Sequence, residues 1–341
     1  MVCSVQDKCG GCPTLHLGRG VELLAKVARV HEVFEQVGLL AQTRPPITGE
    51  KRTGYRNRLR MKVADGRVDL FNQSKDQGCV ALRPGLWDAI TVLRQVTHAD
   101  PNLLFGVAHL EVRVADCGQI GLSFVSINLD NTDWYRPRLQ SELGPAWRIA
   151  DRVATSQPTL RYDLSPTLVN DVPIDAFVQV NSEVNRLLVS YVSDIVSAGT
   201  GQTFLDLYCG AGNLSLPLIE AGLSGVAVER NGSGPTALVE RVDGRQLRVL
   251  TGDVHDLVGG LTPAQVVITN PARSGLKSNH ETIASLASDR MVCVGCEPGP
   301  LASDIAELTK HGFYIDGIQT FDMFPGTDHI ETVVTLLRYD R

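Results

Sequence analysis

The cysteine at position 296 has the surroundings of a reactive thiol. The run from Cys293 to Pro300 reads Cys-Val-Gly-Cys-Glu-Pro-Gly-Pro, at the end of a predicted strand and the start of a predicted helix. The partial positive charge of a helix N-terminus lowers a thiol pKa and favours the nucleophilic thiolate, so Cys296 is a candidate nucleophile. Two plainer interpretations stay open at this point. Cys293 inside the strand fits a small buried hydrophobe, and the pair has the Cys-x-x-Cys spacing of redox sites, which normally open a helix in a different fold.

Candidate proton acceptors occur in the last loop of the chain. The segment from Phe321 to Glu331 leads into the final predicted strand and contains Asp328, His329 and Glu331. Carboxylates and imidazoles are common general bases, so each of the three is a candidate.

Acidic residues follow three successive predicted strands. Asp206-Leu-Tyr-Cys-Gly-Ala-Gly212 contains two glycines that let the backbone approach a ligand, but Ser215 stands where a dinucleotide fingerprint has its third glycine. Glu229 ends the next strand, and its carboxylate could bind two ribose hydroxyls. Asp253 ends the third, where an acid could bind an adenine amino group. Three such acids fit adenosylmethionine better than NAD, whereas each acid alone fits a surface cap equally well.

A basic run lies in the first half of the chain. Six basic residues and no acid occur between Lys51 and Lys62. Within it Arg56, Arg58, Arg60 and Lys62 alternate, so on a strand they would form a positive stripe on one face, or simply a solvated face. The net charge of −6 argues against a protein that coats nucleic acid by bulk charge, but not against a local RNA-binding surface.

Composition predicts a globular protein of two ordinary domains. The chain has 341 residues, of which 43% are hydrophobic and 21% charged. No signal-like leader or membrane-length apolar run is apparent, so we expect a cytoplasmic protein. Its eight cysteines are then expected to be thiols or metal ligands rather than disulfides.

Strands and helices alternate from about residue 175 onwards. Strands are expected at 203–208, 225–229, 247–250, 265–269, 291–295, 314–320 and 332–337, and helices at 181–197, 279–288 and 300–311. This alternation predicts a mostly parallel, doubly wound α/β sheet, in which ligands bind beyond the carboxyl ends of the strands. Before it, residues 21–40 predict an amphipathic helix and residues 54–165 an α+β domain.

Taken together, these segments resemble the RNA uracil-5-methyltransferase family. The resemblance runs through Phe177-Val-Gln-Val-Asn181, Asp206–Gly212, Val228-Glu229, Asn270-Pro-Ala-Arg-Ser-Gly275, Gly295-Cys-Glu-Pro298, Leu301-Ala-Ser-Asp304 and Phe324–Glu331, and includes Gly54-Tyr-Arg-Asn-Arg58. It covers essentially the whole chain, and the joint order of the motifs is specific.

The resemblance implies a fold and a domain arrangement. It implies a Rossmann-like class I methyltransferase domain over 171–341 and a central α+β RNA-binding domain over 21–170. It also implies an iron–sulfur region in 1–20 and around residue 79, where Cys3, Cys9, Cys12 and Cys79 would bind a [4Fe-4S] cluster. By spacing alone the four thiols would equally suit zinc.

The resemblance also implies an activity: methylation of C5 of a uridine in RNA with S-adenosyl-L-methionine. Cys296 would add to C6 of the uracil, and Glu331 would remove the C5 proton. The residues implied to hold the cofactor or the uracil edge are Gln179, Tyr208, Gly210, Glu229, Asp253 and Asn270. Arg56, Arg58 and Arg60 would bind phosphates.

The implied substrate is 23S ribosomal RNA, with tRNA as the alternative. Cys3 lies almost at the start of the chain, which leaves no room for the barrel of many family members and is similar to the barrel-less ribosomal branch, as is Asn270. Ala272, Glu297 and Gly326 replace the family's usual Pro, Asn and His and leave the RNA target open. We expect a monomer with no membrane or DNA partner.

Two other functions compete with this one. Asn270-Pro271 suggests an amino-group methyltransferase, but Arg273 stands where such enzymes have a stacking aromatic residue. A catalytically silent RNA-binding factor is the second alternative, supported only by the three departures from the family pattern.

Overall fold

The computed structural model describes residue 3 and residues 9–40, 42–68, 78–127, 135–150, 157–198, 203–230, 232–242, 244 and 246–339. The chain divides into two compact units. Unit 1 comprises residues 1–16, 50–183 and 325–327, and unit 2 comprises residues 17–49, 184–324 and 328–341. Among the helices of the described ranges, none has the length and apolarity needed to cross a bilayer.

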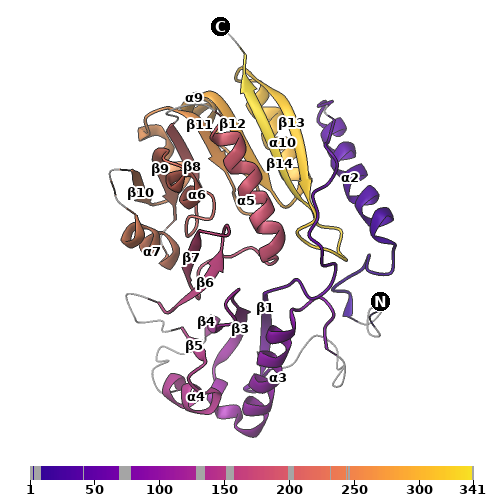
Figure 1. Cartoon of the computed structure of the whole chain (residues 1–341), viewed down its shortest axis with the longest axis vertical. Helices are drawn as coiled ribbons and strands as arrows, with labels where there is room; N and C mark the ends of the chain where they lie inside the picture. The colour runs from indigo at the N-terminus through magenta and orange to yellow at the C-terminus, as the bar shows by residue number, and fades with distance from the viewer. Residues whose placement is uncertain are drawn as a thin grey trace. The chain divides into compact units, whose positions relative to one another are not determined.

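Unit 2 is built on a seven-stranded sheet with the order β10-β9-β8-β11-β12-β14-β13 (Figure 1). Its strands are β8 (Thr203–Leu207), β9 (Ser224–Glu229), β10 (Leu247–Thr251), β11 (Ala264–Thr269), β12 (Ala287–Gly295), β13 (Phe313–Phe321) and β14 (Glu331–Arg338). Strands β8 to β12 are parallel, and β14 runs antiparallel between β12 and β13. The predicted Rossmann-like α/β fold is confirmed.

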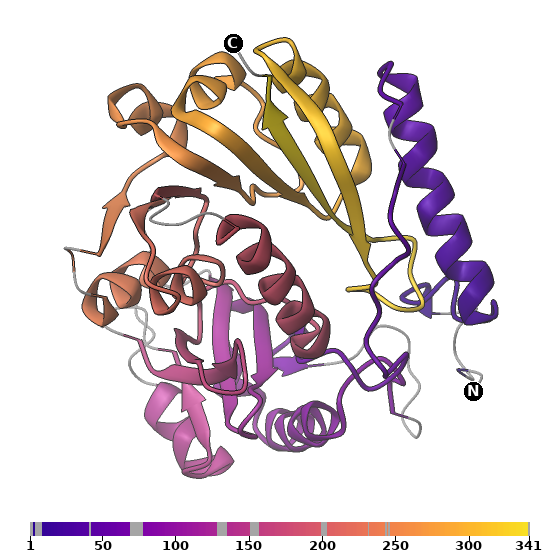
Figure 2. The same cartoon turned by 45° about the horizontal axis from the view of Figure 1, so that its top comes forward.

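Helices cover both faces of this sheet. They are α2 (Arg19–Gln36), α5 (Ser182–Val196), α6 (Ser215–Glu220), α7 (Ser233–Arg241), α8 (Val254–Leu257), η2 (Val258–Gly260), α9 (His280–Leu286) and α10 (Pro298–Thr309). Because side chains alternate along a strand, Leu205 and Leu207 of β8 share one core cluster with Ile283 of α9 and Ile305 of α10. Helix α5 crosses the opposite face (Figures 1 and 2). The carboxyl ends of the parallel strands are thereby left to the loops.

Helix α2 belongs to unit 2, although the sequence places it within the predicted central domain of 21–170. Its Val30 and Phe34 are buried in the same core cluster as α10. The helix buries every fourth residue: Val30 and Phe34 need an apolar surface to pack on, and Lys26 forms ion pairs with Glu22 and Asp322. The domain boundary predicted before residue 21 therefore differs from the division that packing produces.

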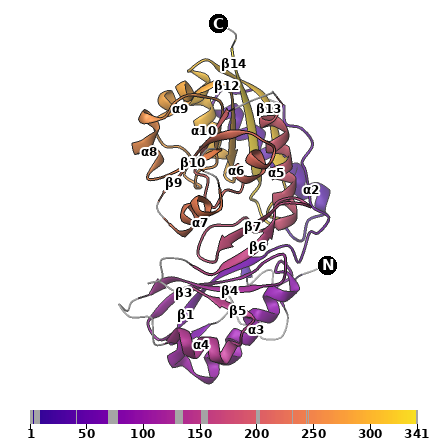
Figure 3. The ribbon, with the colours of Figure 1, turned by 60° about the vertical axis from the view of Figure 1, so that its left-hand side comes forward.

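Unit 1 holds a five-stranded sheet with the order β2-β1-β3-β4-β5 (Figure 3). Its strands are β1 (Arg58–Ala64), β2 (Arg67–Val68), β3 (Val107–Val114), β4 (Ile120–Ile127) and β5 (Trp147–Ile149). The other elements are α3 (Pro84–Ala99), η1 (Pro101–Leu104), α4 (Tyr135–Leu143) and the hairpin of β6 (Thr159–Asp163) and β7 (Val169–Pro173). Met61, Leu110 and Leu122 pack on one face against Leu93 of α3 and Leu139 of α4. The opposite face of the sheet carries its polar residues.

The predicted basic stripe is only partly formed. Arg58 donates to a carboxylate oxygen of Glu111 at 3.0 Å, and its guanidinium lies over the ring of Phe177 at 4.8 Å from the centroid. Arg56 precedes the strand, and its Nε donates to the carbonyl of Arg58. Arg60 is exposed, as is Lys62. The guanidinium of Arg58 is thus largely engaged within the protein, whereas Arg56 uses only its Nε, so phosphate binding by these two residues stays a prediction.

Candidate active site

Cys296 lies immediately after β12 and before α10, as its sequence context predicts. Glu297 is the N-cap residue of α10, and its side chain makes no capping hydrogen bond. Cys293, three residues earlier, is fully buried within β12, and burial raises its pKa to about 12. The two thiols thus have different surroundings: Cys293 is a core side chain, and Cys296 is half-buried at the carboxyl edge of the sheet.

The antiparallel insertion of β14 brings Glu331 to Cys296. Gly295 of β12 pairs with Thr332 of β14, so the next step along both strands sets Cys296 opposite Glu331. Glu331 is 2% exposed, and its Oε2 has no hydrogen-bond partner among the described residues. Burial raises the pKa of Glu331 to about 7, and the positive charge of Arg273 partly opposes the shift. A buried carboxyl group with this pKa can accept and release a proton near neutral pH.

The thiol of Cys296 is less acidic than its position before a helix suggests. Burial raises its pKa to about 11, with a further increase from the negative charge of Glu331 and a smaller one from Glu297. Arg273 acts in the opposite direction. The expected lowering of the pKa by the helix N-terminus is therefore wrong for the free protein, because desolvation and two neighbouring carboxylates outweigh it.

Arg273 also lies at the candidate site. In the sequence, this position was considered only because amino-group methyltransferases have a stacking aromatic residue there. It belongs to the loop after β11, and its charge favours the anionic forms of both Cys296 and Glu331. Asp304 of α10 anchors that loop, because its carboxylate accepts from the backbone N–H of Leu276 at 2.8 Å and lies 2.8 Å from His280 Nε2. Arg273 is part of the Asn270-Pro-Ala-Arg-Ser-Gly motif, so that motif could have pointed to it from the sequence.

Glu297 links α10 to α2 and to the loop before β14. One of its carboxylate oxygens lies 2.7 Å from His329 Nδ1, and the other accepts from Arg29 at 3.2 Å. Arg29 also donates to the backbone carbonyl of Asp328 at 3.0 Å. One turn earlier on α2, buried Lys26 donates to Asp322 at 2.7 Å. Helix α2 therefore holds both ends of the loop that leads to Glu331.

Tyr208 and Gly210 line the edge of the sheet after β8. Tyr208 has a left-handed backbone (φ 68°), which costs energy for a residue other than glycine and often marks a functional site. Its hydroxyl has no hydrogen-bond partner among the described residues. Burial raises its pKa to about 12, with contributions from Asp253, Asp304 and Glu229. A side chain added at Gly210 would meet nothing within 4 Å, so open space adjoins this backbone.

Glu229 and Asp253 already serve the local backbone. The carboxylate of Glu229 accepts from the N–H groups of Gly210 at 2.9 Å and Arg230 at 2.8 Å. Asp253 caps α8 by accepting from the N–H of His255 at 3.0 Å. Asn270 directly follows β11, and its N–H donates to the carbonyl of Leu207 at 3.3 Å. Both carboxylates thus have a structural role, and each oxygen keeps a lone pair for a ligand.

Asp206, the first of the three acids at successive strands, is another buried acid of unit 2. It accepts from the hydroxyl of Ser215, and its other oxygen has no partner among the described residues. Burial raises its pKa to about 7. Ser215, which replaces the third glycine of a dinucleotide fingerprint, therefore ties the start of α6 to β8.

Comparisons with known proteins bear directly on this arrangement. A sequence model of the tRNA (Uracil-5-)-methyltransferase family matches residues 167–230 and 260–339. The chain is 27% identical over 372 residues to a 23S rRNA (uracil(1939)-C(5))-methyltransferase RlmD of Aliivibrio fischeri, covering 99% of this chain and 82% of the relative. It is 29% identical to the protein of the same name in Pseudomonas aeruginosa, covering 97% and 79%. The predicted resemblance to the RNA uracil-5-methyltransferase family is confirmed, and the likeness to these relatives extends over nearly the whole chain.

A solved structure shows the same fold. The Pyrococcus abyssi tRNA (uracil-54, C5)-methyltransferase in complex with S-adenosyl-L-homocysteine covers 96% of this chain and 85% of its own, with a TM-score of 0.71 and 19% identity. The likeness confirms the class I methyltransferase fold that the RNA uracil-5-methyltransferase resemblance implies.

Two sets of expected site residues lie in unit 1 rather than in unit 2. Gln179 follows the β6–β7 hairpin, and its backbone carbonyl accepts from Asn57 at 3.0 Å. The free thiols of Cys3, Cys9, Cys12 and Cys79 are each half-buried.

The four cysteines lie within electrostatic reach of one another. Burial raises the pKa of Cys12 to about 11, with smaller effects of Cys79, Cys9 and Cys3. Within the described ranges no group of three or more His, Cys, Asp or Glu is arranged to hold a metal ion. Residues 1, 2, 4–8 and 69–77 of the predicted iron–sulfur region lie outside those ranges.

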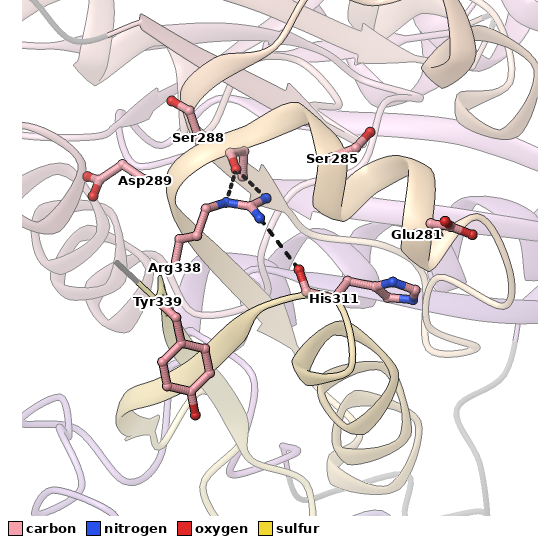
Figure 4. A pocket seen from close by; sticks show the side chains of 8 residues that line it. Glu281, Ser285, Ser288, Asp289, His311, Arg338 and Tyr339 are labelled. Atoms are coloured by element: carbon pink, nitrogen blue, oxygen red, sulfur yellow. Dashed lines mark hydrogen bonds between the residues drawn. The ribbon is translucent and has the colours of Figure 1, made fainter. Parts of the chain in front are cut away.

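A hollow lies at the edge of the unit 2 sheet opposite to the carboxyl ends of the parallel strands, and it is less suitable as an active site than the surroundings of Cys296 (Figure 4). It has a volume of about 640 Å³ and lies where β12 and β13 begin. Its arginine, Arg338, donates to the carbonyls of Ala284 at 2.6 Å and of Ala287 at 2.7 and 2.9 Å. It also donates to the carbonyl of His311 at 3.5 Å, as Figure 4 shows. This guanidinium caps the end of α9 and is therefore committed to the fold.

Proposed function

We propose that this chain methylates C5 of a uridine in RNA, with Cys296 as the nucleophile and Glu331 as the base. The observation that carries the proposal is the register of β12 and β14, which sets the half-buried thiol opposite a buried carboxyl group with a pKa of about 7. Similarity to the RNA uracil-5-methyltransferase family supports the reaction class.

The first task of the site is to make uracil C5 nucleophilic. Addition of the Cys296 thiolate to C6 moves the ring's electron pair onto C5 and O4, which makes C5 an enolate carbon. Because the pKa of Cys296 is high, only the small thiolate fraction attacks, and the thiol proton is released to solvent before the C6–S bond forms. Arg273 stabilises the thiolate, because its positive charge lowers this pKa.

The second task is to release the product. After methylation C5 still carries its hydrogen, and the C6–S bond breaks only when that proton leaves. Glu331 takes the proton, the electron pair of the C5–H bond reforms the C5=C6 double bond, and the thiolate of Cys296 departs. Burial keeps the carboxyl group of Glu331 away from water, so its proton affinity suits this step.

The methyl donor of the proposal is S-adenosyl-L-methionine, which supplies an electrophilic methyl group when bound. The site fits such a ligand, because Gly210 adjoins open space and the buried hydroxyl of Tyr208 has no partner among the described residues. Tyr208, Glu229 and Asp253 would hold it, after β8, at the end of β9 and after β10 respectively, and Asn270 follows the neighbouring strand β11. Gln179 is included from the family pattern.

The proposed substrate is 23S ribosomal RNA. Its support is the pair of relatives named for that RNA, which align with 97–99% of the chain. Transfer RNA is the second candidate, because both the family model and the Pyrococcus abyssi protein are named for it. Catalysis on a stacked base requires the nucleotide to leave its stack, so a loop or a flipped uridine is expected.

The proposal includes a [4Fe-4S] cluster on Cys3, Cys9, Cys12 and Cys79. Its support is the chemistry of four half-buried thiols that influence one another electrostatically. No step of the methylation uses it. Protein purified without oxygen should be brown and contain about four irons per chain; colourless protein with one zinc would contradict the choice of metal.

The function is tested with an unmodified 23S rRNA transcript and labelled S-adenosyl-L-methionine. The wild-type protein should place the label on C5 of one uridine, and Cys296→Ala should form neither product nor a covalent RNA adduct. Cys117→Ala is the matched control, because Cys117 is an exposed thiol in unit 1. An adduct that survives in Cys296→Ala would remove this residue from the role, and an N-methylated base would refute the reaction.

A further inference from the structure

Basic side chains line the exposed half of one face of the unit 1 sheet. Arg60 and Lys62 alternate on β1 and point to the same side. Lys62 pairs with His109 of β3, and Ala64 pairs with Arg67 of β2, so these partners share that side. All four polar side chains are exposed. We call Arg60, Lys62, Arg67 and His109 the basic face.

The acid nearest to the basic face does not neutralise it. Glu111 pairs directly with Arg60 across β1 and β3, but its carboxylate accepts from Arg113 at 2.6 Å and from Arg58 at 3.0 Å. Burial alone would raise the pKa of Glu111, yet the two arginines hold it below its ordinary value. In the described part of the chain, no ion pair or hydrogen bond to an acid engages Arg60, Lys62 or Arg67.

We propose that the basic face binds the sugar–phosphate backbone of the RNA, independently of sequence. This inference depends on the proposed function in one respect, namely that the polyanion is RNA. A chain with a net charge of −6 attracts a polyanion only through a local surface, and this face offers one. Strands β1, β2 and β3 contain no Phe, Tyr or Trp that could stack on a base.

The geometry of the strand suits neighbouring phosphates. Successive residues on one face of a strand are about 7 Å apart, so Arg60 and Lys62 can contact adjacent positions of one RNA strand. Such contacts position the RNA and carry no sequence information. The four side chains of the basic face are themselves polar, and the exposed Phe177 beside them is stacked against Arg58.

The test compares the full-length protein with the triple variant Arg60→Gln, Lys62→Gln, Arg67→Gln. The probe is a labelled 23S rRNA transcript, and its binding is followed by anisotropy over a KCl series. Each phosphate contact contributes roughly 0.7–0.9 to the slope of log affinity against log salt, so the slope should fall by about two. Affinity in about 0.1 M salt should fall on the order of 100-fold.

Arg138→Gln is the matched control. This arginine lies on α4, which covers the other face of the sheet, and it pairs with Asp100 at 2.6 Å. Its removal should change neither the slope nor the affinity.

The outcomes separate this inference from the proposed function. Unchanged affinity and slope in the triple variant, with methylation by the wild-type protein, would overturn the basic face and leave the function standing. Weakened RNA binding in the triple variant would support the face even if the wild-type protein methylated no uridine. Loss of binding to phosphatidylserine vesicles with RNA binding unchanged would also overturn it.

Discussion

Replacing Glu331 by glutamine should produce an enzyme whose nucleophile is more reactive but whose turnover stops. The carboxylate of Glu331 is the leading electrostatic cause of the high pKa of Cys296, after burial. Glutamine keeps the size of the side chain and removes the charge, so the pKa of Cys296 should fall. The same variant lacks the base, so it should accumulate a covalent adduct whose uracil already carries the methyl group.

The magnitude follows from the two pKa values. With a pKa of about 11, Cys296 is thiolate in about one molecule in a hundred at pH 9. A like charge at close range shifts a pKa by on the order of one unit, so Glu331→Gln should react about tenfold faster at that pH. Since the pKa of Glu331 is about 7, the wild-type charge disappears below neutral pH, and the two proteins should then react alike.

The assay is alkylation by iodoacetamide, with the peptide that contains Cys296 quantified by mass spectrometry across a pH series. Turnover and adduct formation are measured on the same preparations. Equal alkylation rates at pH 9 would refute the electrostatic coupling of Cys296 and Glu331. Normal turnover would refute the role of Glu331 as base.

Unfolding measurements control for misfolding. Burial raises the pKa of Glu331 from 4.5 to about 7, so the folded state binds this proton more tightly than the unfolded chain. The corresponding stability is fully present below pH 4.5 and is lost as the pH rises to about 7. The stability of Glu331→Gln does not depend on this proton. The free energy of unfolding of the variant, relative to that of the wild type, should therefore increase by about 3 kcal/mol as the pH rises from 4.5 to about 7.

Three further substitutions test the surroundings of the site. Arg273→Gln should slow alkylation of Cys296 at pH 9, the opposite sign to Glu331→Gln, because a stabilising positive charge is lost; faster alkylation would exclude this role. Glu297→Gln should speed alkylation and cost less than about 1 kcal/mol of stability, since its ion pair with Arg29 is partly solvated; chemical denaturation measures the cost. Lys26→Met should cost about 3–5 kcal/mol, because it leaves two buried carboxylates without their cation; a loss under 1 kcal/mol in urea would contradict this.

The sheet of unit 2 was predictable because its strands are short apolar runs separated by helical stretches. The strands expected at 203–208 and 265–269 are observed at Thr203–Leu207 and Ala264–Thr269. Placement of Cys296 and Tyr208 at strand ends followed directly, since in a parallel sheet those ends lie at one edge. The motifs were therefore sufficient to locate the candidate site.

Pairings between distant segments were not predictable in the same way. Whether Arg58 faces solvent or a carboxylate depends on β3, which lies some fifty residues further along the chain. The sequence shows its alternation with Arg60 but not the presence of Glu111 beside it. Likewise, the periodicity of α2 predicts an amphipathic helix, but only packing on α10 assigns it to unit 2 and buries Glu22 and Lys26 beside Val30 and Phe34.

Local order along the chain, by itself, determined the α/β class, and it predicted the edge of the sheet where the candidate site lies and the thiol and carboxyl group proposed to act there. Tertiary structure alone decided their relation, because β14 enters the sheet antiparallel beside β12 and thereby sets Glu331 opposite Cys296. It also decided their protonation, since desolvation and neighbouring charges, which raise both pKa values, depend on what surrounds a group in space.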